Sequence, residues 1–212
     1  MRPPENWRAA RVTLVLAAVT AAAWILASAT GLQGEAVVRG AFIPGLLGQE
    51  LPIWRVPFVL TPLSATLLHA DIIHLVFNLL FLLFCGRAIE PVLGRASVVI
   101  LYVAGAYAAA AAQYLVAPEE LIPMIGASGA ISAVLGAYAM LFGRNKVKVE
   151  NPTVALWLHA LWLIAAWVVL QTVVGFVFSS ANLKIAVAAH IGGFIPGLLL
   201  ARPLLLFHYR RA

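Results

Sequence analysis

The sequence GASGAISAVLGAYAMLFG occupies residues 126–143 and decides the fold that we predict for this chain. It begins as a loop and becomes an apolar helix over 128–143, which is too short to cross a hydrocarbon core about 30 Å thick. Ser128 stands where the helix begins, and three cations follow it at 144–148, which we assign to the cytoplasmic surface. With a rise of about 1.5 Å per residue, Ser128 lies about 24 Å above that surface. We therefore expect a hydroxyl inside the membrane, beside irregular backbone over 121–127 that lines a water-filled cavity open to the outside.

The composition favours a polytopic membrane protein over a soluble one. Of the 212 residues, 63% are hydrophobic and 10% are charged, and the mean hydropathy is +0.98. We expect a single all-α domain over 1–212, with six transmembrane helices and a long membrane-associated loop at 31–66 after the first helix. The expected spans are 11–30, 70–88, 97–117, 128–143, 153–178 and 184–206.

The basic residues are distributed in a way that predicts the orientation. With the N-terminus inside, three cations face outward and eleven face the cytoplasm, so both termini are expected to be cytoplasmic. The charge therefore reflects topology and not nucleic-acid binding, and a compact bacterial inner-membrane protein is expected. Residues 27–29, Ala-Ser-Ala, also allow a cleaved secretory signal, but the apolar stretch is long for one. The eleven are Arg2, Arg8, Arg11, Arg87, Arg95, Arg144, Lys146, Lys148, Arg202, Arg210 and Arg211; the outer three are Arg39, Arg55 and Lys184.

Two further polar residues reach the depth of Ser128. His74 lies 13 residues before Arg87 and His190 lies 12 residues before Arg202, which places them about 20 Å and 18 Å above the cytoplasmic surface. Polar side chains within a membrane are candidate functional groups, and a shared depth is what a common site requires.

These residues suit acyl transfer by a Ser-His dyad. A helix N-terminus offers Ser128 free backbone N–H groups that can hold an oxyanion, and His190 can act as the base. Gly193 and Gly197 share the face of His190 and permit close approach of the fourth span, where Gly129 lies on the matching surface. The alternative interpretations are that Ser128 only caps the helix and that His190 only packs against its neighbours.

His74 and Asn78, spaced i, i+4, project from one helix face as neutral donors for an oxyanion hole, unless they only hydrogen-bond neighbouring helices. His69 is expected to point away from that face, which argues against a metal pair. No HExxH motif or G-x-S-x-G elbow is present, and Asp71 is the sole aspartate. The single Cys85 excludes an intrachain disulfide and is interpreted as a packing residue. We expect no metal and no organic cofactor.

In combination these motifs resemble the rhomboid family of intramembrane serine proteases, from about Trp54 to Gly197. The resemblance implies Ser128 as nucleophile, His190 as general base and acid, and an oxyanion hole of His74, Asn78 and the Ser128 N–H. It also implies that the fifth span is a lateral gate for transmembrane protein substrates. The motifs are Trp54-Arg55, the run from His69 to Asn78, Glu90 with Gly94, GASGAISAVLGAY from Gly126 to Tyr138, and AHIGG from Ala189 to Gly193. Gly126, Gly129, Gly193 and Gly197 would permit close packing, and His69 and Glu90 match structural positions.

The chain departs from the family pattern at Ser132, where some members carry a tyrosine that stacks on the catalytic histidine. This leaves open what supports the imidazole of His190. Trp54-Arg55 also stands unusually far from His69. Two other functions remain possible: a catalytically silent member that binds transmembrane clients, and a small-solute transporter, for which an internal repeat and buried carboxylates would be expected.

Overall fold

The computed structural model describes residues 10–49, 53–143, 149–180 and 186–210. Across these ranges the regular structure is helical, and one isolated antiparallel bridge joins Phe42 to Met124. Seven of the cations used to predict the topology lie outside the described residues: Arg2, Arg8, Arg144, Lys146, Lys148, Lys184 and Arg211.

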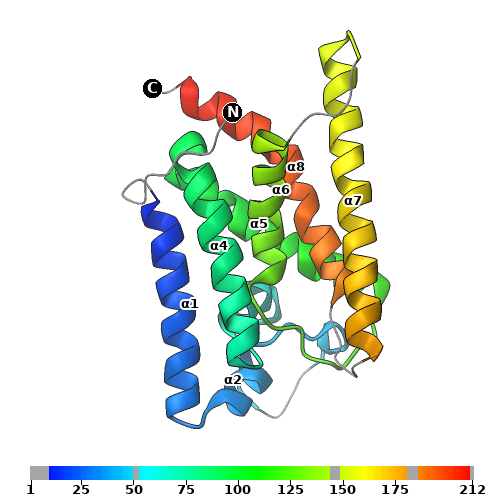
Figure 1. The fold of residues 1–212 in the computed structure, drawn as a ribbon. Helices are drawn as coiled ribbons and strands as arrows, with labels where there is room; N and C mark the ends of the chain where they lie inside the picture. Colours follow the sequence, from blue (N-terminus) through cyan, green and yellow to red (C-terminus); the bar gives the residue numbers. More distant parts are fainter. Residues whose placement is uncertain (1–9, 50–52, 144–148, 181–185, 211–212) are drawn as a thin grey trace.

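Among the described residues, six helices of 15 to 29 residues form the bundle drawn in Figure 1. Five of them are long and apolar enough to cross a membrane, whereas the 15 residues of α6 make a shorter apolar helix. The chain is therefore an all-α membrane protein, as predicted, while the number of spans stays a prediction. The helices are α1 (Arg11–Ala29), α4 (Ile72–Leu93), α5 (Arg95–Val116), α6 (Ser128–Phe142), α7 (Pro152–Ser180) and α8 (Val187–Tyr209).

The short helix α6 lies at the centre of the bundle, in contact with α4, α5 and α8. Small side chains make this possible, because Gly129, Ala133 and Gly136 let the neighbouring backbones come close. One hydrophobic cluster, which includes Val134 of α6 and Leu101 of α5, fills the space between these four helices. A central helix contacts protein on most sides, so it need not match the thickness of the bilayer.

The beginning of α1 and the end of α8 lie at one end of the bundle, and the beginning of α4 lies at the other (Figure 1). Glu90 fixes the beginning of α1. Its carboxylate is 1% exposed and accepts hydrogen bonds from the backbone N–H groups of Val12 and Thr13, each at 2.8 Å, and from the Thr13 hydroxyl at 2.7 Å. A carboxylate at a helix N-terminus satisfies free N–H groups and interacts favourably with the helix dipole.

The segment after α1 is structured and reaches the loop that leads to α6. It contains α2 (Gln33–Gly40), α3 (Thr61–Ser64) and 3₁₀ turns at Pro44–Leu46, Phe58–Leu60 and Ala65–Leu67. The backbone of Phe42 exchanges two hydrogen bonds with Met124, and the Gly45 N–H donates to the Glu120 carbonyl. These hydrogen bonds hold the loop before Ser128 against this segment.

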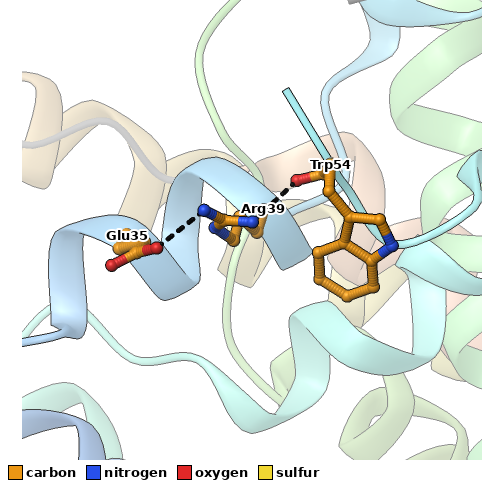
Figure 2. Close-up of polar contacts among 3 residues, drawn as sticks. All are labelled: Glu35, Arg39 and Trp54. Atoms are coloured by element: carbon orange, nitrogen blue, oxygen red, sulfur yellow. Dashed lines mark hydrogen bonds and ion pairs between the residues drawn. The ribbon is translucent and has the colours of Figure 1, made fainter. Parts of the chain in front are cut away.

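Arg39 of α2 lies between Glu35 and Trp54, as Figure 2 shows. Its guanidinium pairs with Glu35 at 2.8 Å, donates to the Trp54 carbonyl at 3.3 Å and lies 5.8 Å from the centre of the Trp54 ring. Arg55 donates to the Ala41 carbonyl at 3.1 Å. These contacts close the segment on itself, while the Trp54 side chain stays 69% exposed.

Candidate active site

Ser128 is the first residue of α6, and its hydroxyl does not cap the helix. The N-cap position is Ala127, and the preceding Gly126 has φ +108°, which favours glycine. The Gly126 N–H donates to the Ala65 carbonyl at 2.9 Å. The backbone therefore turns sharply into the helix and leaves the Ser128 side chain available for another partner.

That partner is His190 of α8. The Ser128 Oγ lies 2.8 Å from the His190 Nε2, and both side chains are half-buried. This is the distance at which an imidazole can take the proton of an attacking hydroxyl. The two residues predicted from depth as nucleophile and base are in hydrogen-bond contact.

Glycines bring α6 and α8 to this distance. A Cβ at Gly193 would collide with the carbonyl oxygen of Gly129, and one at Gly197 would collide with the carbonyl oxygen of Ala133. Reciprocally, a Cβ at Gly136 would lie 2.5 Å from the Phe194 carbonyl oxygen. The two backbones therefore touch along about two turns, and any side chain at these positions would force them apart.

His74 and Asn78 lie on α4. The Asn78 side chain is 5% exposed and donates one N–H to the His74 carbonyl at 2.9 Å; a side-chain amide has a second N–H to offer. A Cβ at Gly126 would lie 2.6 Å from the His74 Nε2, so the His74 ring reaches the loop just before Ser128. The Asp71 carboxylate caps the start of α4 at the His74 N–H.

The expectation that His69 points away from His74 was wrong. The two rings meet edge to face, with centroids 5.0 Å apart. The expectation assumed helical spacing between them, but α4 begins only at Ile72, so the chain before it turns the His69 ring back toward the site. There the His69 Nε2 accepts a hydrogen bond from the Ala127 N–H at 3.4 Å.

The sequence reasoning missed two residues of α7 that contact His190. The Gln171 Oε1 lies 3.0 Å from the His190 Nδ1, and the Trp167 indole N–H donates to the His190 carbonyl at 3.1 Å. A signal existed, because Gln171 is the one side-chain amide within the expected span 153–178, and intramembrane polar groups are candidates by default. Ser132 instead hydrogen-bonds within α6, to the Ser128 carbonyl at 2.8 Å.

Within the described ranges, no group of three or more His, Cys, Asp or Glu side chains could hold a metal ion. Cys85 is a buried free thiol in the core cluster between α4, α5, α6 and α8. The chemistry that these residues offer is a hydroxyl, an imidazole and neutral N–H donors.

Comparison with known proteins identifies the family. The Rhomboid domain model matches residues 53–207, and the chain belongs to the rhomboid family. The chain is 30% identical over 194 residues to the rhomboid protease GlpG of Pectobacterium atrosepticum, covering 92% of this chain and 63% of the relative. It is 27% identical over 190 residues to GlpG of Haemophilus influenzae, covering 89% and 88%.

A third relative is the rhomboid protease GluP of Bacillus subtilis, 31% identical over 153 residues, which cover 71% of this chain and 26% of the relative. The chain thus spans 63% of the Pectobacterium protein and about a quarter of GluP. All three relatives are named as rhomboid proteases.

Proposed function

We propose that this protein is an intramembrane serine endopeptidase that cleaves transmembrane segments of membrane proteins. The observation that carries the proposal is the 2.8 Å contact between the Ser128 Oγ and the His190 Nε2 at the start of a buried helix. A packing histidine or a capping serine would not require this contact. The protease names of the relatives support the same reaction class.

The reaction is acyl transfer. The His190 Nε2 takes the proton of the Ser128 hydroxyl while the Oγ attacks the carbonyl carbon of the scissile peptide bond. The resulting tetrahedral oxyanion collapses, the C–N bond breaks, and His190 gives its proton to the leaving amine. His190 then takes a proton from water as the water oxygen attacks the acyl carbon, the ester C–O bond to Ser128 breaks, and His190 returns the proton to the Ser128 Oγ.

The oxyanion hole is proposed to consist of the Ser128 backbone N–H, Asn78 and His74. The first N–H groups of a helix have no intrahelical partner, and the positive end of the dipole favours negative charge there. Asn78 has one N–H beyond the bond it makes to His74. The His74 ring lies against the loop at Gly126, so both donors come from the helix that flanks the nucleophile.

Substrate entry is proposed at α7. In its most apolar 18-residue window only 11% of residues are buried, against 39% in α4 and α5, and Trp157 is 56% exposed. A helix with so little packing can separate from the bundle at low cost and admit a substrate helix. The substrate must unwind locally, because a helical peptide carbonyl is already hydrogen-bonded.

The proposal also covers the orientation of the protein in its membrane and the access of water to Ser128. We propose that the protein lies in a bacterial inner membrane and, from the positive-inside rule, that both termini lie on its cytoplasmic side. Arg11, Arg95 and Arg210 at the ends of α1, α5 and α8 support this orientation. Ser128 would then open to the outer side through a water-filled cavity, and the bilayer would surround one six-helix domain. No nucleic acid or cofactor takes part.

The experiment is labelling of the purified protein with a fluorophosphonate probe, together with cleavage of a transmembrane reporter in liposomes. Ser128→Ala and His190→Ala should abolish both signals while the protein stays folded in detergent. Ser97→Ala is the matched control, since Ser97 of α5 is a buried serine whose hydroxyl donates to the Leu93 carbonyl at the end of α4. Cleavage that persists in Ser128→Ala would refute the assignment.

Two other outcomes would replace the proposal. Reporter binding without cleavage or labelling in the wild-type protein would indicate a silent client-binding member of the family. Solute flux across the liposome without either signal would indicate a transporter.

A further inference from the structure

Both ring nitrogens of His190 have a partner. The Nε2 faces the Ser128 Oγ at 2.8 Å and the Nδ1 faces the Gln171 Oε1 at 3.0 Å. A neutral imidazole carries its proton on one nitrogen only. To accept the serine proton at Nε2, His190 must carry its own proton at Nδ1, where an acceptor is needed.

We propose that Gln171 is the positioning residue of the catalytic dyad: its amide oxygen accepts a hydrogen bond from the His190 Nδ1–H. This bond selects the tautomer in which Nε2 is a free base and fixes the plane of the ring. The inference rests on the proposed function and extends it to a residue of α7.

Burial makes this contact effective. Gln171 is 6% exposed, so water does not compete strongly for its amide oxygen. A carboxylate would select the same tautomer, but a neutral amide does so without placing a second charge in an apolar site. Gln171 thereby supplies the support for His190 that Ser132, bonded within its own helix, does not give.

The same helix holds His190 a second time. Trp167, one turn before Gln171, donates its indole N–H to the His190 carbonyl, and its ring stacks on Phe194 with centroids 5.0 Å apart and an interplanar angle of 15°. The two residues share one face of α7. Because both contacts come from the least buried of the long helices, a displacement of α7 would remove the acceptor from the Nδ1. Base orientation therefore depends on the position of the helix at which we propose substrate entry.

The test compares three variants of α7. Gln171→Met keeps the length of the side chain and removes the acceptor, whereas Gln171→Glu keeps an acceptor. Thr172→Val is the matched control, because the Thr172 hydroxyl is exposed and donates to the Val168 carbonyl of its own helix. For each we would measure the rate of fluorophosphonate labelling, and kcat and KM for a transmembrane reporter.

Gln171→Met should lower the labelling rate and kcat by about 10- to 100-fold with KM changed less than about threefold, because loss of the orienting partner affects the base and not substrate binding. Gln171→Glu should recover most of the rate, and Thr172→Val should match the wild type. A Gln171→Met protein that labels at the wild-type rate would overturn the inference, and so would equal losses in the Met and Glu variants.

A measurement on the wild-type protein avoids dependence on how the variants fold. The ¹⁵N NMR signals of labelled histidine distinguish the two tautomers, and the His190 signals are assigned by their loss in His190→Gln. We expect the proton on Nδ1; a proton on Nε2 would overturn the inference. The proposed function fails separately, if the wild-type protein is neither labelled nor able to cleave the reporter.

Discussion

Gly193→Ala should separate the nucleophile from its base while leaving the fold intact. A Cβ at position 193 would collide with the Gly129 carbonyl oxygen and lie 3.0 Å from the carbonyl carbon, whereas ordinary contacts of a Cβ fall at 3.4–4 Å. The obstacle is backbone on a buried helix, so α6 and α8 must move apart by about 1 Å, at a cost of about 1–3 kcal/mol of folding free energy.

The consequence for the site follows from the present contact. The Ser128 Oγ and the His190 Nε2 are 2.8 Å apart, and an extra 1 Å takes them beyond the roughly 2.6–3.2 Å range for proton transfer. A misplacement of about 1 Å in an active site costs on the order of 10²-fold in rate. We expect a fall of this size in the second-order rate constant for fluorophosphonate labelling, measured in detergent with the melting temperature recorded in parallel.

Gly192→Ala is the matched control for the cost of crowding. Its Cβ would collide with Ala112 and lie 2.8 Å from the Ala108 carbonyl oxygen, both on α5. Gly192→Ala should lower the melting temperature about as much as Gly193→Ala does, but it pushes α8 away from α5 and not away from α6, which carries Ser128. If Gly193→Ala labels at the rate of Gly192→Ala, close approach of α6 and α8 does not set the reactivity of Ser128.

Three other predictions concern the oxyanion hole, the core and pH. Asn78→Ala should lower kcat by about 10²- to 10³-fold with little change in KM, as for loss of an oxyanion donor. A rise in KM by as large a factor as the fall in kcat would instead indicate that Asn78 binds the substrate. Glu90→Ala should cost about 1–3 kcal/mol or more in unfolding free energy, because it leaves buried N–H groups of α1 unpaired; Glu35→Ala, which breaks an exposed ion pair, should cost less than about 1 kcal/mol. Burial, with a smaller contribution from His74, lowers the pKa of His69 from 6.5 to about 4. As the pH falls from 6.5 toward 4, His69 therefore takes up a proton in the unfolded chain but not in the folded one. The free energy of unfolding should decline over this range by at most about 3 kcal/mol. His69→Gln should show a smaller decline than the wild type in melting temperature over that pH range, and an equal decline would assign it to other groups.

Much of the fold followed from local properties of the sequence. The expected span 97–117 corresponds to α5 at Arg95–Val116, and the expected short helix 128–143 corresponds to α6 at Ser128–Phe142. Apolar run length and the residues that interrupt it are visible in one dimension, so these boundaries could be placed to within a few residues. The helix that contains most of the expected span 70–88 is α4, which continues through Pro91 to Leu93.

Part of the site could also be predicted. Counting residues along helices predicted a similar depth for Ser128, His74 and His190, and their depth in a membrane stays a prediction. The glycines that allow their helices to touch are recognisable by their spacing. The orientation of His69 could not be predicted in this way, because the chain between His69 and α4 is not helical, and periodicity gives no direction there.

The sequence by itself determined that this chain is an all-α membrane protein, and it predicted a serine and a histidine at similar depths within it. Both depend on hydropathy and on the fixed rise of a helix, which are local quantities. Only the tertiary structure decided that Ser128 and His190, 62 positions apart, are in contact, and that Gln171 holds the second nitrogen of the ring. Such contacts depend on how each helix is rotated and how closely its neighbours approach, and these result from the packing of the whole bundle.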